Sequence, residues 1–449
     1  MSRLLHRQLT TPYPTVARGE GVYLYDTAGK RYLDASGGAA VSCLGHGHPK
    51  VVAAIKAQLD DVAYAHTAFF TSRAAEALAE WLVARAPAGF GRAAFVSGGS
   101  EAVEGAMKLA RQIHLERGER ERCHFIARRQ SYHGGTLGTL ALGGRPSSRA
   151  PFEAIFGGGM AMSHIAPCYA YRERRDDESE EEYGLRAAYE LEAEILRVGP
   201  GKVAAFVAET VSGATLGAVP PAPGYFREIR RICDAYGVLL IVDEVMAGMG
   251  RTGHLFAIAE DGVSPDLIAI AKGLGGGYQP IGGVLVRDAH AEALVAGSGV
   301  LNWSHTYLAH PVACAAALAV QQVVEEEGLL ARVREQGEAL RRMLVARLGQ
   351  HAHVGDIRGR GLFVGVELVQ DRDSKTPFAR AQRLAERFKA RAMENGLICY
   401  PMGGTAGEAG GDHVLLAPPF IISDGELAEL TDKLALTLDE TLAGTAGAR

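Results

Sequence analysis

Two charged side chains stand directly after two short apolar runs near the middle of the 449-residue chain. Asp243 follows the run 238–242, and Lys272 follows the run 267–271. A lysine amine can form a Schiff base with an aldehyde, and an aspartate can hold a pyridine ring nitrogen in its protonated form. These are the two anchors that the cofactor pyridoxal phosphate (PLP) requires, so the sequence predicts one site in which the two residues have different roles.

The apolar runs also predict the elements that position these groups. Each run is short, rich in branched residues and bounded by turn formers, which is typical of a buried strand. The run 202–208 is a further predicted strand, and it leads directly to Glu209. Ligands of open α/β sheets bind just outside the carboxyl ends of the strands. We therefore expect Glu209, Asp243 and Lys272 at the same edge of one sheet.

A polar loop between a predicted strand and a predicted helix is a candidate phosphate site. The strand covers residues 93–96 and the helix 101–116, with a tight loop of small residues between them. Unpaired backbone N–H groups and the helix dipole attract an anion at such a helix start, which makes Gly98, Gly99 and Ser100 candidate phosphate ligands. A plain strand-to-helix turn with a serine cap is the alternative interpretation.

Two histidine-containing motifs need separate interpretations. Tyr132 and His133 precede two glycines at the end of a predicted strand, where an aromatic ring can lie flat on a planar cofactor. A buried tyrosine with a structural role explains the same motif equally well. His46 and His48 in GHGHP suggest a metal site, but without a third ligand a structured turn is the better interpretation, and no metal is expected.

The composition excludes several classes of function. A hydrophobic content of 47% and a charged content of 22% are ordinary for a globular enzyme. The net charge of -5 gives no argument for nucleic acid or an anionic membrane as partner. Six scattered cysteines without a C-x-x-C pair indicate a reduced, cytoplasmic protein. We expect neither a signal peptide nor a membrane helix, which needs about 20 apolar residues.

The length exceeds what one simple core requires, so more than one domain is expected. Residues 1–60 are predicted to form an entry segment with a β-hairpin, and residues 61–325 a large domain with strands and helices in alternation. From about residue 325 the chain changes to long charged helices that flank short strands. We expect residues 326–449 to form a smaller α+β domain together with the first segment. The densely charged run 171–183 is predicted to be a solvated surface segment.

Several longer motifs, in order along the chain, resemble those of one enzyme family. The motifs are FVSGGSEAVEGAMKLAR, SYHGGTLG, PPAPGYFREIRRICDAYGVLLIVDEVMAGMGRTG and AIAKGLGGGYQPIGG. They are similar to motifs of the class III (subgroup II) PLP-dependent aminotransferases, the omega-aminotransferase group of PLP fold type I. The resemblance extends from about Thr15 to the last predicted helix. It implies an α/β fold with a large domain, whose mostly parallel central sheet is flanked by helices, and a small α+β domain made by the two terminal segments.

The resemblance implies roles for the residues around the cofactor ring. Lys272 carries PLP, and Asp243 bonds the pyridine nitrogen. Val245 packs on one face of the ring and Tyr132 covers the other. His133, next to Tyr132, is counted among the cofactor-binding residues.

The resemblance also implies phosphate contacts and a shared site. Gly98, Gly99 and Ser100 hold the phosphate of the same subunit. Thr306 resembles a threonine that reaches the phosphate from the neighbouring subunit, so a homodimer with active sites shared between subunits is expected. Glu209 matches a glutamate near the cofactor that can pair with a substrate-binding arginine in related enzymes.

The implied activity is transfer of an amino group from an amine or omega-amino acid to a keto acid. Pyruvate is the default acceptor and 2-oxoglutarate the second choice, with Lys272 as the base. Decarboxylation-coupled transamination, an aminomutase or a racemase would use the same lysine and Asp243, so these alternatives stay open. A nucleotide-binding oxidoreductase is disfavoured because GLGGG does not give G-x-G-x-x-G. A non-catalytic scaffold is disfavoured because both anchors are present.

The chain departs from the family pattern at two places. Several relatives have R-G-D-H where residues 410–413 read GGDH, so the arginine for the acceptor carboxylate is absent there or displaced by the glycine-rich loop. Arg145, Arg149 or backbone donors are candidates to replace it. Ala40 stands where amine-specialised relatives often have a bulky aromatic, and the small residues of 39–41 predict a roomier pocket entrance.

Overall fold

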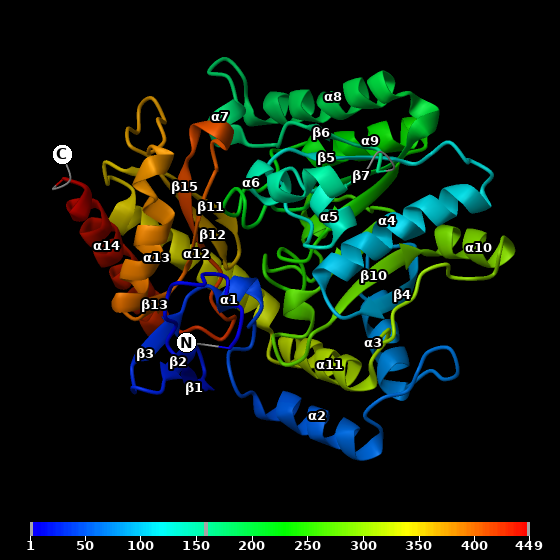
Figure 1. The fold of residues 1–449 in the computed structure, drawn as a ribbon, viewed down its shortest axis with the longest axis horizontal. Helices are drawn as coiled ribbons and strands as arrows, with labels where there is room; N and C mark the ends of the chain where they lie inside the picture. The colour runs from blue at the N-terminus through cyan, green and yellow to red at the C-terminus, as the bar shows by residue number, and fades with distance from the viewer. Residues whose placement is uncertain (1–2, 157–159, 447–449) are drawn as a thin grey trace.

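A seven-stranded sheet forms the centre of the computed structural model, which describes residues 3–156 and 160–446 (Figure 1). Its strands, in spatial order, are β4 (Phe90–Val96), β10 (Gly282–Arg287), β9 (Leu267–Ile270), β8 (Leu239–Asp243), β7 (Val203–Glu209), β5 (His124–Arg128) and β6 (Met162–Ile165). Strand β10 is antiparallel to both of its neighbours, and the other pairs are parallel. The mostly parallel sheet predicted from the sequence is confirmed.

Helices cover both faces of this sheet because its buried strands are apolar on both faces. On β8, Leu239 and Ile241 pack into one core cluster, whereas Leu240 and Val242 pack into the other. The helices of the first face are α4 (Gly99–Glu116), α5 (Leu137–Leu142) and α10 (Asp288–Ala296). Those of the second face are α3 (Arg73–Val83), α8 (Glu180–Val198), α9 (Tyr225–Tyr236) and part of α11 (Pro311–Glu326).

The register of the parallel strands brings the predicted charges together. Glu209, the last residue of β7, lies opposite Asp243, the last residue of β8. Asp243 in turn lies opposite Ala269 of β9, and Lys272 follows the end of β9 by two residues. The expectation that these three side chains meet at one sheet edge is therefore confirmed.

Both ends of the chain build a second core. Two four-stranded sheets belong to it. The strands of the first, in spatial order, are β1 (Val16–Glu20), β2 (Tyr23–Asp26), β3 (Arg31–Asp34) and β13 (Leu397–Ile398). Those of the second are β11 (Val354–Arg360), β12 (Phe363–Leu368), β15 (Asp412–Leu416) and β14 (Tyr400–Gly403). Its helices are α2 (Pro49–Asp61), α12 (Leu329–Leu348), α13 (Leu384–Glu394) and α14 (Asp424–Ala446). Figure 1 shows the blue N-terminal strands beside the orange and red C-terminal elements.

Leu33 near the start of the chain and Leu434 near its end share this second core cluster. The predicted boundary near residue 325 lies inside α11, which contributes Ala313 to the large core and Val320 to the small one. The boundaries near residues 60 and 325 stay predictions. Short helical turns complete the described chain: α1 (Gly37–Ala40), α6 (Pro146–Arg149), α7 (Ala170–Glu173), η1 (Ala150–Ile155), η2 (Pro200–Lys202), η3 (Ala257–Asp261), η4 (Lys272–Leu274), η5 (Arg380–Gln382) and η6 (Gly407–Ala409).

A buried ionic network joins the two cores and corrects one prediction. Glu367 on β12 is fully buried and accepts hydrogen bonds from Arg172 Nε at 2.7 Å and from the Tyr169 hydroxyl. Arg358 Nη1 on β11 lies 2.6 Å from the same carboxylate. Arg172 begins the charged run 171–183, so this end of the run is not solvated as predicted but reaches into the structure.

We expect Glu367→Gln to destabilise the protein, because the change removes the buried counter-charge of Arg172 and leaves Arg358 with Asp356 as its remaining acidic partner. Breaking a buried pair on one side typically costs about 3–5 kcal/mol of unfolding free energy. The urea concentration at the unfolding midpoint should fall clearly. Glu20→Gln is the matched control, since Glu20 pairs with Arg18 on the exposed surface, where such a pair contributes about 1 kcal/mol or less. Equal midpoints for the two variants would contradict the prediction.

Candidate active site

A cavity of about 390 Å³ opens at the carboxyl ends of β7, β8 and β9 and at the start of α4. The predicted site residues that line it are Gly98, Gly99, Ser100, Tyr132, His133, Glu209, Asp243, Val245 and Lys272. Thr306 does not line it. Lining residues that sequence reasoning missed are Val211, Ala214, Met246, Gln279, Pro280 and Ile281. They come from loops without a periodic pattern, although Gln279 to Ile281 directly continue the lysine motif.

Lys272 presents its amine to this cavity from a strained turn. Its φ of 48° is in the left-handed region, which is uncommon for a residue with a side chain. Gln321 of α11 fastens the turn, because its Nε2 donates to Gly273 O at 2.8 Å and to Leu274 O at 3.0 Å. A buried glutamine on a helix of small apolar residues was the signal in the sequence for this support, and it was missed.

Burial shifts the Lys272 amine toward its neutral form. Burial lowers the pKa of the amine to about 8, and the carboxylates of Asp243 and Glu209 partly oppose this shift. A neutral amine is the form that can attack an aldehyde or accept a proton. The site therefore holds Lys272 close to a chemically active state near neutral pH.

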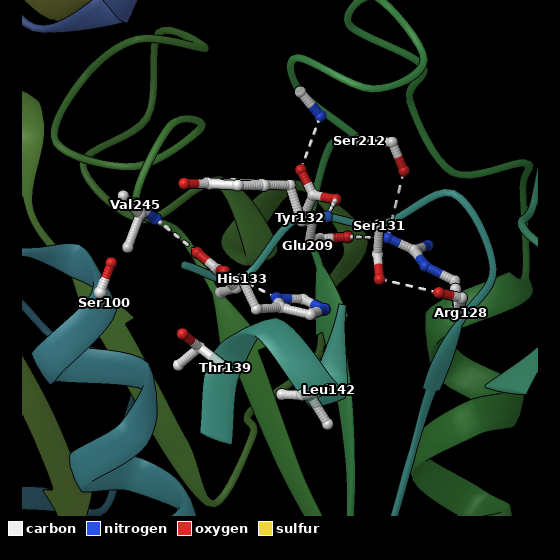
Figure 2. A network of polar contacts seen from close by, with 12 residues as sticks. Ser100, Arg128, Ser131, Tyr132, His133, Thr139, Leu142, Glu209, Ser212 and Val245 are labelled. Carbon is white, nitrogen blue, oxygen red and sulfur yellow. Dashed lines mark hydrogen bonds and ion pairs between the residues drawn. The ribbon is translucent and has the colours of Figure 1, made fainter. Parts of the chain in front are cut away.

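Asp243 is held in a fixed orientation by two donors. His133 Nδ1 lies 2.8 Å from Asp243 Oδ2, and the backbone N–H of Val245 donates to Asp243 Oδ1 at 3.0 Å (Figure 2). The Nε2 atom of His133 is buried and has no hydrogen-bond partner among the residues that the structure describes. An oriented, hydrogen-bonded carboxylate can hold a positive charge on a neighbouring ring nitrogen.

Glu209 connects the tyrosine loop to the loop after β7 (Figure 2). Its Oε1 accepts from Tyr132 N at 3.3 Å, and its Oε2 accepts from Gly213 N at 2.7 Å. Burial raises the pKa of the Glu209 carboxyl, with His133 opposing this shift. Arg128 contacts only the main-chain carbonyl of Glu209, at 2.5 Å, so no arginine pairs with this carboxylate among the described residues.

The turn from β4 into α4 has the shape of an anion cradle. A Cβ atom added to Gly99 would lie 2.8 Å from Val245 Cγ1, so only glycine fits this close approach. Ser100 Oγ accepts from Gly135 N at 3.0 Å, which holds the tyrosine loop against the start of the helix. Unpaired N–H groups at the start of a long helix bind phosphate oxygens. The prediction of a phosphate site on this turn agrees with this geometry.

We expect Gly99→Ala to weaken the binding of a phosphate-bearing ligand such as PLP, because the added methyl group has to displace Val245, which also lines the cavity. A loss of about 1.4 kcal/mol corresponds to a tenfold larger dissociation constant. Equilibrium dialysis of the cofactor-free protein against PLP measures this constant. Gly201→Ala is a suitable control, since an added Cβ atom meets nothing within 4 Å there. An unchanged constant for Gly99→Ala would show that Val245 and the cradle are not tightly coupled.

Comparisons with known proteins identify the family of the chain. The family model for aminotransferase class-III matches residues 6–438. The chain belongs to the class-III aminotransferases. An uncharacterized aminotransferase of Schizosaccharomyces pombe is 47% identical over 96% of this chain and 93% of its own length, and one of Bacillus subtilis is 40% identical over 96% of both chains. The protein is therefore a transferase, an enzyme that moves nitrogenous groups.

Solved structures place the fold among the omega-transaminases. An (S)-enantioselective omega-transaminase from Thermomicrobium roseum matches with a TM-score of 0.91 and 35% identity, over 98% of this chain and 96% of that one. The omega-transaminase of Pseudomonas jessenii, solved in complex with PMP, matches with a TM-score of 0.90 and 33% identity, over 97% and 94% of the two chains. The fold of the aminotransferase is thus the type I α/β fold that the sequence predicted.

Thr306 of this aminotransferase lies away from the cavity of its own chain. Its main-chain carbonyl accepts from the Tyr64 hydroxyl at 2.7 Å. Large apolar rings near it are strongly exposed, with Tyr307 60% exposed. Phe69 and Phe70, on the loop that follows Tyr64, are 78% and 68% exposed. Such a patch is typical of a surface that another protein covers.

The departures from the family pattern have clear structural counterparts. In the GGDH segment, Asp412 is buried and accepts from Ala385 N at 3.2 Å, so residues 410–413 present no cation to the cavity. Val41 lines the cavity as the pocket hypothesis expects. Ala40 itself does not line it but is buried in a cluster with Met246, which does, so the pocket hypothesis stays a prediction for this residue.

The two histidines of GHGHP contact carboxylates one at a time. His46 Nε2 lies 3.6 Å from Asp34 Oδ2, and His48 Nε2 lies 3.3 Å from Glu327 Oε1. Within residues 3–156 and 160–446, no group of three or more potential ligands is arranged to hold a metal ion. In the same part of the chain, no helix is both long enough and apolar enough to cross a bilayer.

Proposed function

We propose that this aminotransferase uses PLP to move an amino group from an amine or omega-amino acid to a keto acid, with pyruvate as the main acceptor. The observation that carries the proposal is the convergence of Lys272, Asp243 and the Gly99 cradle on one cavity. A reactive amine, an oriented carboxylate and an anion cradle are the three contacts that PLP needs. The unpartnered Nε2 of His133 and the absence of room for a Cβ atom at Gly99 are further signs of a built ligand site.

When it is bound, PLP supplies a ring that accepts electrons from the substrate carbon. The residues of the chain supply the rest. Asp243 would hold the ring nitrogen in its protonated form, and His133 orients Asp243. Lys272 Nζ, whose pKa burial lowers to about 8, would take a proton from the donor carbon and deliver it to the cofactor carbon that receives the amino group. Val245 and Tyr132 would hold the ring, and Glu209 accepts a hydrogen bond from the backbone of Tyr132.

We further propose a homodimer in which Thr306 completes the phosphate site of the partner. This assignment is supported by the exposed ring of Tyr307, the neighbour of Thr306 in the chain, by the exposed rings of Phe69 and Phe70 on the loop that follows Tyr64, and by the fact that Thr306 does not line its own cavity. The six cysteines carry free thiols. This supports the proposal that the enzyme works in the reducing cytoplasm.

Spectroscopy of the purified protein tests the function. The PLP-loaded enzyme should be yellow, and a panel of amines added without any keto acid should bleach the colour with one class of donor. A protein that stays colourless after incubation with PLP would overturn the cofactor assignment. Consumption of a second keto acid in stoichiometric amount separates transamination from an aminomutase or racemase, and release of CO₂ reveals a coupled decarboxylation.

A further inference from the structure

Backbone pairing fixes Arg145 beside the tyrosine that lines the cavity. Gln130 N donates to the carbonyl oxygen of Gly144 at 2.9 Å, and Gly144 N donates to Ser131 O at 3.2 Å. Arg145 follows this pair directly, and Tyr132 follows it on the other side. Because main-chain atoms make the pairing, the position of Arg145 relative to Tyr132 is set by the fold.

The guanidinium of Arg145 lies between the two parts of the molecule without an acidic partner. Its Nη2 donates to Gly403 O, at the end of β14, over 3.3 Å. Burial lowers the pKa of the guanidinium, and the phenols of Tyr400 and Tyr132 oppose this shift, so both rings lie within its electrostatic range. Among the described residues, no carboxylate oxygen is within 4.0 Å of its nitrogens. A half-buried guanidinium has five N–H donors, and most of these remain available.

The other arginines near the cavity are engaged or loosely placed. Arg128 is buried and donates to the Glu209 carbonyl and to Ser212 Oγ. Arg149 donates to the His164 ring and lies 4.0 Å from Glu153. Arg7 also lies near enough to Tyr132 to affect its pKa, but it is exposed and belongs to no helix or strand.

We propose that Arg145, which stands next to Tyr132 and contacts β14 but is not itself part of the cavity wall, binds the carboxylate of the keto-acid acceptor on the Tyr132 side of the cavity. The inference rests on the proposed transamination and names the group that recognises its acceptor. A guanidinium fork matches the planar carboxylate in geometry and charge. The substrate carboxylate provides the counter-charge that the chain itself does not, and the weak contact with Gly403 O gives way to it. Arg145 thereby takes over the task for which residues 410–413 offer no cation.

Steady-state kinetics with matched acceptors test the role. The holoenzyme and its Arg145→Gln and Arg145→Lys variants are assayed with isopropylamine as a donor without a carboxylate. Pyruvate is the acceptor in one series, and butanone, which has no charge, in the other. Loss of a charge-assisted hydrogen bond should raise KM for pyruvate about 10- to 100-fold in Arg145→Gln, with kcat and the butanone reaction nearly unchanged. Arg145→Lys should recover part of the loss.

Two variants and a binding measurement decide between the possible outcomes. Arg149→Gln should leave KM for pyruvate unchanged, and so should Arg7→Gln. Propionate, a dead-end carboxylate, should bind the wild-type holoenzyme in a calorimetric titration and bind Arg145→Gln about 10- to 100-fold more weakly. The proposal is overturned if pyruvate and butanone suffer equally in Arg145→Gln, or if Arg7→Gln shows the selective loss instead.

This design separates the failure of the inference from the failure of the proposed function. If isopropylamine does not bleach the wild-type holoenzyme and no keto acid is consumed, the proposed transamination fails with this donor, whereas the propionate titration still reports on Arg145. If the wild-type enzyme turns over and Arg145→Gln keeps its normal KM for pyruvate, the proposed function stands and the role of Arg145 is wrong.

Discussion

Replacing Lys272 with alanine is expected to abolish turnover while the protein remains folded. In the proposed mechanism, the change removes both the amine that attaches PLP and the base that moves the proton. General acid–base catalysis alone contributes about 10²- to 10⁴-fold, so the loss of both functions should exceed about 10⁴-fold. The protein should remain folded, because alanine removes the buried amine entirely and leaves no unpaired polar group at this position. Steady-state assays and the visible spectrum of the variant measure the two effects separately.

The spectrum distinguishes loss of catalysis from loss of the cofactor. The variant should still retain some PLP through the Gly99 cradle and Asp243, but without the covalent link. Lys108→Ala is a matched control, because Lys108 is on the outer face of α4, with its side chain 50% exposed. Measurable steady-state transamination by Lys272→Ala would sink the assignment of the base.

Asp243→Asn should give the second largest loss of activity, because it removes the negative charge of one carboxylate. Asparagine has nearly the same shape, but it cannot hold a positive charge on a ring nitrogen, so the electron sink is weakened. Removing one preorganised electrostatic contact of this kind typically slows a reaction about 10²- to 10³-fold. Stopped-flow measurement of the amine half-reaction reports this step without the need for a keto acid. Asp234→Asn, at a position that is 67% exposed on α9, is the control.

A second readout follows from the pKa of Lys272. Burial lowers this pKa to about 8. Of the two carboxylates that oppose the shift, Asp243 has the larger effect on the pKa. Removing the charge of Asp243 should therefore lower the pKa of Lys272 in the cofactor-free protein further, below about 8. Chemical labelling of the lysine as a function of pH measures it. A near wild-type half-reaction together with an unshifted labelling profile would argue against both roles of Asp243.

The parts of the site that are carried by strand ends were predictable from the sequence. The apolar runs before Glu209 and Asp243 define buried strands, and the carboxyl ends of parallel strands meet at one edge. The glycines before α4 were also readable, because a tight turn into a long helix has few physical solutions.

The parts that are carried by loops and by long-range pairing were not predictable. Arg145 and Arg149 are equal candidates in the sequence, and the structure distinguishes them by the pairing of Gly144 with Gln130 and Ser131 and by the contacts of Arg149 with His164 and Glu153. Such irregular pairing has no periodicity to recognise. Similarly, the charged run at 171–183 looks solvated until its partner Glu367, almost 200 positions later in the chain, is known.

The chain order of the small domain has a consequence for biosynthesis. Leu33 of β3 pairs in parallel with Leu397 of β13, and the core around it includes residues as late as Leu438. The ribosome releases the N-terminal strands long before these partners exist, so one edge of β3 stays open while the entire large domain is made. Open edges and exposed apolar faces of nascent chains promote aggregation. The nascent enzyme should therefore depend on chaperones until its last hundred residues emerge, and a circular permutant that begins near residue 326 should depend on them less.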